Sequence, residues 1–451
     1  MWRALYNGLL ILAAPAVLAV LLMKRRCRRG LPQRLGLENG LFGLSRQPDR
    51  PNRPDGPLIW VHAVSLGEVV AVTPLVTALH RRHPDHRIIV STVTETGREA
   101  VEQRLAGIAE HRYAPLDFPW VVSRVVARWR PVLYLFVETE LWPNLLWRLH
   151  ANGVPAVLVN GRLSSRSFRR QRIGPVRSFY RSVLRSLTLC LMQSDRDAQR
   201  IIALGADRRS VHVTGNVKFD QPVPAAQTEV SFRARLGISE QEQLLLAGST
   251  HAGEEEILVS AYRRLVTDYP ATVLMLAPRH IERVDQVARM VQEAGLPVQY
   301  RSRLDHIGAG PRVVLLDTRG ELARAYREAV VAFVGGTLVP VGGHNLLEPA
   351  VWGTPVAFGP HTDHCADIAE LLLHAGGGQR IDGVEALVQL LRTWLADRQA
   401  RAAAGQAAQR VVLENQGALA RSLERIDTCL VPASSGGSTD QSTKPALVRP
   451  T

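Results

Sequence analysis

Short apolar runs rich in β-branched residues alternate with amphipathic helical patterns over most of the chain. In the first half, the apolar runs predict strands over Leu58–His62, Ile88–Thr92, Val132–Val137, Val154–Asn160, Leu189–Gln193 and Val211–Thr214. Helical patterns lie between them, for example over Val69–Arg82 and Asn144–Asn152. Such alternation predicts a parallel sheet that is covered by helices on both faces.

The alternation pauses at residues 218–228, which contain two prolines and no periodicity and are therefore typical of a linker. It resumes with predicted strands over Leu244–Ala247, Thr272–Leu276, Val313–Leu316, Val330–Val334 and Pro355–Phe358. We therefore expect two α/β domains, residues 38–217 and 229–428, that face a cleft. Residues 429–451 are polar and lack a core pattern, which predicts a disordered tail.

The N-terminus departs from this pattern. Residues 4–23 form a stretch of 20 without a charged side chain, which is long enough for one membrane-spanning helix. A basic juxtamembrane segment, residues 24–37, follows and begins with Lys24. Because positive flanks stay in the cytoplasm, we expect residues 1–23 to be a retained anchor with a short N-terminus outside. A shallow interfacial helix, broken at Pro15, is the alternative.

Composition and charge narrow the classes of function. The 451 residues are 46% hydrophobic and 21% charged, which is ordinary for a folded protein and excludes collagen and multi-span transporters. The 55 Lys and Arg exceed the 41 Asp and Glu, so the formal net charge is +14. This excess favours an anionic partner: a nucleic acid, a phosphorylated substrate or a membrane surface. Four widely separated cysteines argue against a disulfide framework.

Polar residues follow several predicted strands, where ligands of open α/β sheets bind. Glu68 follows the first strand and lies in the first turn of a helix. It either complements the helix dipole or acts as a general base. Glu138 and Glu140 close the third strand, and two acids after so apolar a strand indicate a site. The structural alternative there is capping of the next helix by Asn144.

The second domain offers basic, hydroxyl and glycine residues at the corresponding places. Ser249 and Thr250 precede a helix, where free backbone N–H groups can hold a phosphate or the side chains can simply cap. Arg279 and His280 close the next strand, and an arginine there can grip a phosphate or carboxylate. The chain contains neither GxxxxGK[ST] nor GxGxxG, which disfavours a P-loop or dinucleotide site.

Two glycine pairs flank the richest loop. Gly335-Gly336 ends a strand, and Gly342-Gly343 leads into His344, Asn345 and Glu348. Glycines let the backbone approach a ligand closely, and Asn345 and Glu348 are expected on one helix face. Glu348 is placed to accept hydrogen bonds from both hydroxyls of a ribose. The alternative is a structural turn with a capping Asn.

A basic block and a possible metal cluster complete the candidates. Eight arginines occur with no acid between them: Arg162, Arg166, Arg169, Arg170, Arg172, Arg177, Arg181 and Arg185. Interleaved apolar residues favour an anionic membrane surface over nucleic acid, and a merely solvated face is the third interpretation. His361, Asp363, His364 and Cys365 cluster, but Asp363 is a natural helix cap, so we expect no metal site.

Taken together, these motifs resemble the 3-deoxy-D-manno-octulosonic acid (Kdo) transferase family of lipopolysaccharide synthesis. The resemblance runs from the N-terminal helix to about residue 428. It rests on Leu66–Glu68, Glu138–Asn144, Asn160–Ser164, Thr214–Asp220, Ala277–His280 and Gly342–Glu348. The departures are small: Leu66 stands where Val is common, and Gly161 stands where Ala is common.

The resemblance implies a GT-B glycosyltransferase with two Rossmann-like domains at the inner membrane. It implies transfer of Kdo from CMP-Kdo to a tetraacylated lipid A precursor, with inversion and without a metal or other cofactor. Glu68 would be the general base, and Glu138, Glu140 and Arg162 would lie on the acceptor side. The implied donor residues are Lys218, Ser249, Thr250, Arg279, His280, Gly336, Gly343, His344, Asn345 and Glu348.

Two other classes of function remain open. One is a different GT-B enzyme, such as a UDP-sugar transferase or a nucleotide-sugar 2-epimerase. The other is a non-enzymatic binder of anionic lipid or nucleic acid, which would leave the polar residues after the strands without a role. The number of Kdo residues added and the oligomeric state do not follow from the sequence.

Overall fold

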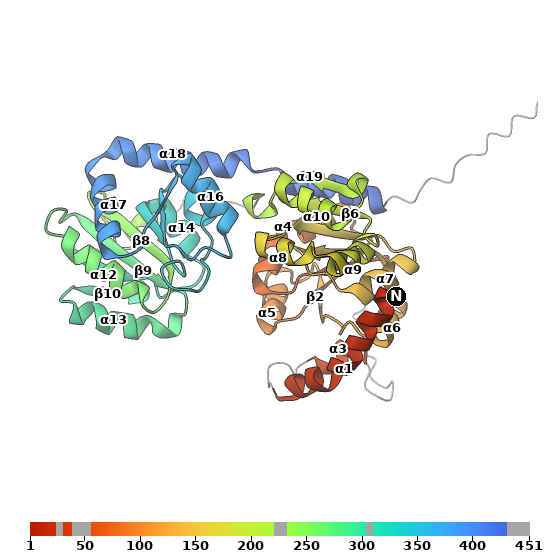
Figure 1. Cartoon of the computed structure of the whole chain (residues 1–451). Helices are drawn as coiled ribbons and strands as arrows, with labels where there is room; N and C mark the ends of the chain where they lie inside the picture. Colours follow the sequence, from red (N-terminus) through yellow and green to blue (C-terminus); the bar gives the residue numbers. More distant parts are fainter. Residues whose placement is uncertain (24–29, 38–55, 221–231, 304–309, 431–451) are drawn as a thin grey trace, which may run out of the picture. The chain divides into compact units, whose positions relative to one another are not determined.

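The computed structural model describes residues 1–23, 30–37, 56–220, 232–303 and 310–430 (Figure 1). The chain divides into two compact units. Unit 1 comprises Met1–Gln221 and Gly417–Thr451, and unit 2 comprises Pro222–Gln416. The predicted disordered tail beyond residue 430 and most of the predicted linker lie outside the described residues.

Unit 1 is built on a parallel sheet of seven strands in the order β3-β2-β1-β4-β5-β6-β7. The strands are β1 Leu58–His62, β2 Arg87–Thr92, β3 Glu110–Tyr113, β4 Pro131–Val137, β5 Ala156–Gly161, β6 Leu189–Met192 and β7 Val211–Val213. Its helices are α1 Trp2–Met23, α3 Leu31–Arg34, α4 Leu66–Arg82, α5 Glu95–Arg104, α6 Pro119–Trp129, α7 Pro143–Ala151, α8 Ser165–Gln171, α9 Gly174–Leu184, α10 Asp195–Leu204, η1 Arg208–Ser210, η2 Val217–Asp220 and α19 Ala418–Leu430.

Unit 2 repeats this plan with the strand order β10-β11-β9-β8-β12-β13-β14. The strands are β8 Gln243–Thr250, β9 Thr272–Pro278, β10 Val298–Tyr300, β11 Arg312–Leu315, β12 Ala329–Val334, β13 Val356–Phe358 and β14 Gly378–Arg380. Its helices are α11 Phe232–Arg235, α12 Glu254–Leu265, η3 Ile281–Arg283, α13 Val284–Glu293, η4 Arg301–Arg303, α14 Leu322–Glu328, α15 Leu347–Ala350, α16 Ala366–Ala375, α17 Val384–Ala396 and α18 Arg398–Glu414.

The central strands bury apolar side chains on both faces of each sheet, as expected of parallel sheets that are covered by helices. In β1 every residue is buried. Trp60 packs into the core on one face, with Phe136 and Leu158, whereas Ile59 and Val61 pack into the core on the other. The prediction of two parallel α/β sheets is therefore confirmed, and each predicted strand is present within a few residues.

The three strands that the apolar pattern missed lie at sheet edges. They are β3, β10 and β14, with the sequences EHRY, VQY and GQR. An edge strand is paired on one side only and is often short and polar, so it carries no continuous apolar run. The missed strands change the size of each sheet and leave its central order intact.

The C-terminal helix belongs to unit 1, so the predicted second domain, 229–428, extends too far. Unit 2 ends at Gln416. In α19, Leu423 and Ile426 are buried in the core of unit 1 together with residues of α4. Asp220 reinforces this packing by accepting hydrogen bonds from the N–H groups of Gly417 and Leu419, both at 2.6 Å.

The predicted N-terminal helix is present as α1, Trp2–Met23. Within the part of the chain that the structure describes, no helix is both long and apolar enough to cross a membrane. The helix is thus confirmed and its crossing of a membrane is not. The described part of the predicted basic segment packs on the sheet: Arg34 is buried, lies over the Tyr113 ring and donates to the carbonyl of Val93.

Candidate active site

The acidic candidates of unit 1 come together at the carboxyl ends of two central strands of its sheet. Strands β1 and β4 are parallel neighbours, with His62 paired to Phe136 near their carboxyl ends. Glu68 lies in the first turn of α4, just after β1, and Glu138 and Glu140 directly follow β4. The sequence therefore predicted correctly that these three carboxylates share one edge.

Glu68 reaches back to the turn in front of its own helix. Its carboxylate accepts hydrogen bonds from the N–H of Val64 at 2.7 Å and from the hydroxyl of Ser65 at 3.3 Å. Burial, followed by the nearby charges of Glu138 and Glu140, raises the pKa of Glu68 to about 7, against the lowering effect of these hydrogen bonds. A carboxylate that titrates near neutrality suits proton transfer better than one with an ordinary pKa.

Lys218 lies beside the acids of unit 1. It belongs to η2, and its Nζ is 3.4 Å from Glu138 Oε1. Glu138 itself has a left-handed backbone with φ of 57°, and its N–H bonds to the carbonyl of Val159. A non-glycine residue in this conformation is uncommon, and such strain gathers at functional sites.

The loop after β4 is tied to the loop after β5. The hydroxyl of Thr139 donates to the backbone carbonyl of Arg162, which places Arg162 next to this acidic loop. Glu140 is exposed at its surface, but the partial burial of its carboxyl group and the charge of Glu138 raise its pKa. The structure thus brings all four predicted residues of this side, Glu68, Glu138, Glu140 and Arg162, into one unit.

Helix α7 is not capped by Asn144, which corrects the structural alternative. Asn144 is the second residue of the helix and is buried. The helix-starting N–H groups of Asn144 and Leu145 instead bond to the carboxylate of Asp117. Sequence reasoning missed Asp117 because it lies 27 residues before Asn144, whose N–H it accepts.

In unit 2, Ser249 and Thr250 belong to the end of β8 and cap no helix. The next helix, α12, begins at Glu254 with Gly253 as its N-cap. Thr250 is buried, and its hydroxyl donates to the carboxylate of Glu255. Ser249 has a left-handed φ of 56° at the irregular end of the strand pairing. Like Glu138, it is a non-glycine residue with a left-handed backbone near the carboxyl end of a central strand.

A buried carboxylate, Glu254, occupies backbone N–H groups that we expected to hold a phosphate. Glu254 is fully buried. It accepts four backbone hydrogen bonds of 2.8–3.0 Å, from His251, Gly336, Thr337 and Leu338. The expectation of free N–H groups at this helix start is therefore wrong for His251. Sequence reasoning missed this role, although an acid directly before an apolar helical run was the available signal.

Conformation and packing account for the glycines of the richest loop. Gly336 and Gly343 have φ of 69° and 86°, which disfavour any other residue. A Cβ on Gly336 would lie 3.0 Å from His344 Cδ2, and one on Gly343 would lie 2.9 Å from Cys365 Sγ. Backbone conformation and the neighbouring side chains His344 and Cys365 therefore already require glycine at these two positions.

Imidazole and guanidinium groups gather at the carboxyl edge of unit 2. His251 and His344 stack with ring centroids 5.1 Å apart, and their Nε2 atoms are 2.8 Å apart. His280 lies 5.9 Å from His251, and Arg279 is exposed beside it. Burial, together with neighbouring cationic groups, lowers the pKa of His344 to about 4 and also lowers that of His251. At neutral pH this end of the sheet offers neutral imidazole groups beside the Arg279 cation.

Asn345 and Glu348 do meet, although not on one helix face. Helix α15 begins only at Leu347, and the Asn345 side chain accepts a hydrogen bond from the Leu347 N–H. The Asn345 amide donates to Glu348 at 3.4 Å. Both functions of Asn345 are thus present: it caps the short helix, and it orients the carboxylate predicted to bind a ribose.

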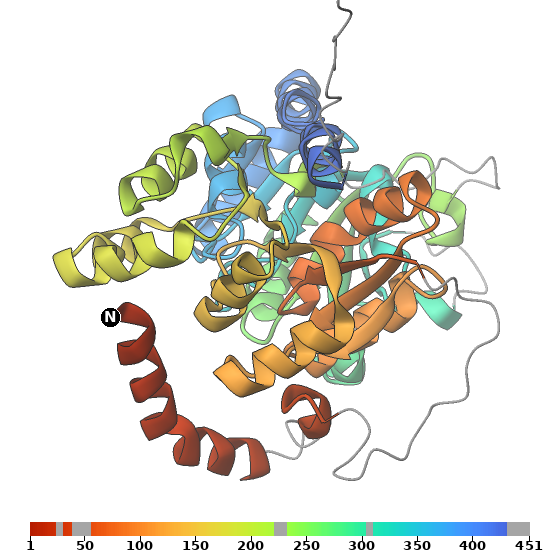
Figure 2. The ribbon, with the colours of Figure 1, turned by 90° about the vertical axis from the view of Figure 1, so that its right-hand side faces the viewer.

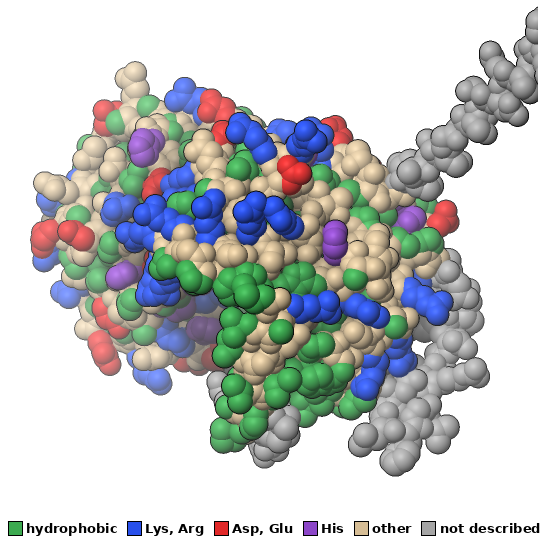
Figure 3. All heavy atoms as spheres, turned by 45° about the vertical axis from the view of Figure 1, so that its right-hand side comes forward, with side chains coloured by type: hydrophobic (Ala, Val, Ile, Leu, Met, Phe, Trp, Pro, Cys, Tyr) green, Lys and Arg blue, Asp and Glu red, His purple; other side chains and the backbone are tan. Residues whose placement is uncertain are grey.

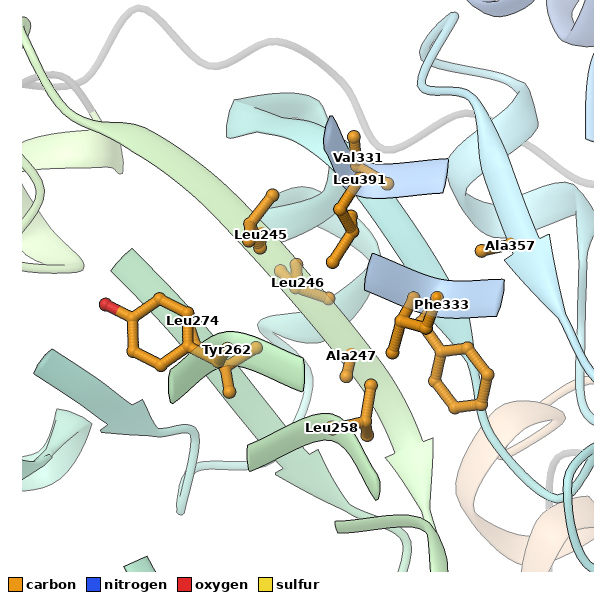
Figure 4. A pocket seen from close by; sticks show the side chains of 11 residues that line it. Leu245, Leu246, Ala247, Leu258, Tyr262, Leu274, Val331, Phe333, Ala357 and Leu391 are labelled. Atoms are coloured by element: carbon orange, nitrogen blue, oxygen red, sulfur yellow. The ribbon is translucent and has the colours of Figure 1, made fainter. Parts of the chain in front are cut away.

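Two other features of unit 2 bear on what it can bind. Among the described residues, no group of three or more His, Cys, Asp or Glu is placed to hold a metal ion. A small pocket is lined by core side chains such as Leu246, Leu274 and Phe333 (Figure 4). Tyr262 also lines the pocket, and its hydroxyl donates a hydrogen bond to the carbonyl of Thr272. This pocket is a packing gap and offers no partner to a polar ligand.

Comparisons with known proteins agree with this layout. A family model described as 3-deoxy-D-manno-octulosonic-acid transferase matches residues 29–221. A putative UDP-N-acetylglucosamine 2-epimerase from Listeria monocytogenes has a TM-score of 0.57 at 14% identity, covering 83% of this chain and 96% of that chain. This likeness shows the fold alone and supports the expected GT-B-like architecture.

Two relatives match over nearly their full length. The 3-deoxy-D-manno-octulosonic acid transferase of Haemophilus influenzae is 33% identical over 425 residues, which cover 94% of this chain and 98% of the relative. The transferase of the same name from Bordetella pertussis is 36% identical over 443 residues, covering 95% and 100%. The chain therefore belongs to the 3-deoxy-D-manno-octulosonic acid transferase family of glycosyltransferases.

Proposed function

We propose that this protein transfers Kdo from CMP-Kdo to a tetraacylated lipid A precursor, with inversion and without a metal. The observation that carries the proposal is the placement of Glu68. Its pKa of about 7 and its position among Glu138 and Glu140 at the sheet edge suit a base that accepts a hydroxyl proton. Family membership supplies the sugar that is moved.

In the proposed step, the deprotonated carboxylate of Glu68 takes the proton of an acceptor hydroxyl. The hydroxyl oxygen forms a bond to the anomeric carbon of Kdo while the bond from that carbon to the CMP phosphate oxygen breaks. The electron pair of that bond leaves with CMP, and attack from the opposite face inverts the centre. Nearby carboxylates stabilise the positive charge that develops on an oxocarbenium-like sugar.

Unit 2 is proposed to hold the donor. Arg279 and His280 supply N–H donors for the phosphate or the sugar carboxylate, and such fixed donors stabilise the charge of departing CMP. The neutral His251–His344 pair adds donors without a second fixed charge. Glu348, oriented by Asn345, is proposed to accept hydrogen bonds from the ribose hydroxyls. Because Glu254 occupies the amides of Gly336 and Thr337, we assign the phosphate to side chains rather than to that loop's backbone.

Gly67 is proposed to leave room for the acceptor. Unlike Gly336 and Gly343 of unit 2, it has no positive φ and lies in helix α4, and a Cβ there would meet nothing closer than Ser65 Oγ at 4.0 Å. Glycine costs roughly 0.5–1 kcal/mol in a helix relative to alanine. Neither conformation nor internal packing requires that cost at Gly67, so close approach of a ligand beside Glu68 is the remaining physical reason.

We further propose that the protein works at the cytoplasmic face of the inner membrane. Helix α1 exposes large apolar side chains: Leu5, Leu9, Ile11, Leu12 and Met23. Figure 3 shows hydrophobic side chains gathered over this helix with basic side chains nearby. The arginine block of α8 and α9 adds cations to the same unit. Apolar and basic groups together favour binding to an anionic lipid surface. A phosphorylated lipid acceptor has the same combination of acyl chains and negative charge.

The product mass tests the proposal. The full chain is incubated in detergent with CMP-Kdo, a tetraacylated bisphosphorylated lipid A precursor and excess chelator, and the lipid is weighed by mass spectrometry. We expect a gain of one or more Kdo units, which also counts the additions. Glu68→Gln should abolish the gain, whereas Glu102→Gln on the exposed face of α5 should not.

Three outcomes would overturn parts of this proposal. No product with CMP-Kdo, but transfer from a UDP-sugar, would replace the donor. Product that forms only without chelator would replace the metal-free mechanism. Full activity of Glu68→Gln would remove Glu68 from the chemistry while leaving the family unchanged.

A further inference from the structure

Asp117 is a buried carboxylate at the start of α7 and has so far only the role of a cap. It is 7% exposed. Its oxygens accept hydrogen bonds from the N–H groups of Asn144 at 3.0 Å and Leu145 at 2.9 Å. Trp142, at the N-cap position, provides no side-chain bond, so Asp117 satisfies the first donors of the helix.

The third donor to Asp117 comes from α1. The hydroxyl of Tyr6 donates to Asp117 Oδ2 at 2.9 Å. The side-chain amide of Asn144, a residue only 1% exposed, donates to Asn7 Oδ1 at 2.7 Å and to the backbone carbonyl of Asp117 at 2.6 Å. Two adjacent residues of α1 therefore supply a donor to the buried Asp117 carboxylate and an acceptor for the buried Asn144 NH₂ group.

Aromatic packing fixes the same end of α1. The ring of Tyr6 lies 5.6 Å from Phe179 and 6.1 Å from Trp147, measured between centroids. Trp2 lies 6.2 Å from Phe179 and donates to the hydroxyl of Ser178 at 3.0 Å. Figure 2 shows α1 as a separate rod whose N-terminal end lies beside the helices that include α9. The contact is thus a packed interface and not one isolated hydrogen bond.

This interface involves the start of α7, which follows the acidic loop directly in the chain. The loop, residues 138–142, begins at the end of β4, where the Glu138 N–H bonds to Val159, and it ends where α7 begins at Pro143. Glu140 lies between these two fixed points. A shift of the first turn of α7 would therefore move the loop, and reacting groups lose rate steeply when they are misplaced by even 1 Å.

We propose that the first two turns of α1 are a positioning element of the acceptor side, acting through Asp117 on the loop that carries Glu138 and Glu140. The inference rests on the proposed function and assigns Tyr6 and Asn7 a role apart from attachment to lipid. Under this inference, Tyr6 and Asn7 lie on the same side of the membrane as the rest of unit 1.

The test uses the full chain in detergent, where attachment to a bilayer plays no part. Tyr6→Phe, Asn7→Ala and the double variant are compared with Tyr180→Phe, which removes a hydroxyl that accepts a hydrogen bond from the Gln171 amide of α8. We expect the double variant to lower kcat/KM for the lipid acceptor about tenfold. The KM for CMP-Kdo should not change. Hydrogen exchange of the amides in residues 138–145 should become faster.

A second control separates positioning from lipid binding. Leu12→Ala removes an α1 side chain that is 79% exposed, so it should weaken binding to anionic vesicles and leave turnover in detergent unchanged. Acceptor kcat/KM within twofold of wild type in the double variant, or an equal loss for both substrates, would overturn the inference. If wild type itself transfers no Kdo, the proposed function fails, and unchanged exchange in residues 138–145 would then overturn the positioning role separately.

Discussion

Both units place polar residues just after the carboxyl ends of the central strands of a parallel sheet. The charges of these residues are opposite in the two units. Unit 1 gathers Glu68, Glu138 and Glu140, with Lys218 as a described cation beside them. Unit 2 gathers Arg279 and a stacked pair of neutral histidines. The fold therefore fixes where chemistry happens, and the loop sequences decide whether an edge takes up a proton or holds an anion.

The contrast extends to two glutamates that both begin helices after central strands. Glu68 accepts one backbone N–H and one hydroxyl, and burial with neighbouring acids raises its pKa to about 7. Glu254 is fully buried and accepts four backbone N–H groups. The first is left with capacity to take a proton, whereas the second uses its oxygens to hold a loop in place.

The largest expected effect breaks the acidic side of the comparison. Glu68→Gln removes the proposed base, so kcat should fall by about 10³-fold, within the usual contribution of general-base catalysis. Because the pKa of Glu68 lies near 7, wild-type kcat should rise with pH through about 7 and level off above it. Steady-state kinetics from pH 5.5 to 9 check both expectations. A rate that is flat across pH 7 would contradict the role of Glu68.

The next effect tests whether Glu254 is structural. Glu254→Gln replaces one acceptor oxygen by an NH₂ group that faces backbone donors, so we expect a loss of about 3 kcal/mol in the free energy of unfolding. Glu256→Gln is the matched control, since Glu256 is exposed and accepts only the Gly253 N–H. Denaturant unfolding measures the difference. Equal stability of the two variants would refute the loop-holding role.

A smaller effect sharpens the comparison through glycine. Gly67→Ala should stabilise the protein slightly, because alanine is the better helix residue, and should still lower kcat/KM for the acceptor about tenfold. Gly336→Ala should destabilise it instead, because its φ is 69°. Thermal unfolding and kinetics on both variants check the opposite signs. An unaltered acceptor kcat/KM in Gly67→Ala would remove the proposed close approach.

The smallest effect concerns the neighbours of Glu68. Glu138→Gln removes a negative charge that raises the pKa of Glu68, so the midpoint of the rise in kcat with pH should move to lower pH. Burial is the larger cause of the raised pKa, so the shift should stay below about one pH unit. The pH profile of the variant, compared with wild type, measures it. A shift to higher pH would contradict the charge interaction.

The central strands and the carboxyl-edge residues could be predicted because their signals are local. An apolar run that ends in Glu138 or Arg279 indicates both a strand and its functional end. Edge strands such as β3 carried no such run, and they were missed. The path of α19 back to unit 1 depends on the burial of Leu423 and Ile426, a tertiary fact that no local pattern contains.

The partners of the candidate residues were less predictable than their positions. Lys218 was predicted to bind the donor, and the structure adds a contact with Glu138 of unit 1 that was not predicted. Asp117 and Tyr6 meet across 111 positions of sequence, and a single sequence gives no sign of such a pair. Glu254 is one of three consecutive glutamates, and the sequence does not distinguish it from Glu256. In the structure Glu254 is buried and Glu256 is exposed.

Binding of CMP to matched variants tests the division of labour between the two units most directly. Isothermal titration is carried out with CMP on wild type, Glu68→Gln and Arg279→Ala, each first shown to be folded. The account predicts that Glu68→Gln binds CMP as wild type does while transferring no Kdo, and that Arg279→Ala binds CMP about tenfold more weakly. Weakened CMP binding by Glu68→Gln, together with unaltered binding by Arg279→Ala, would contradict it.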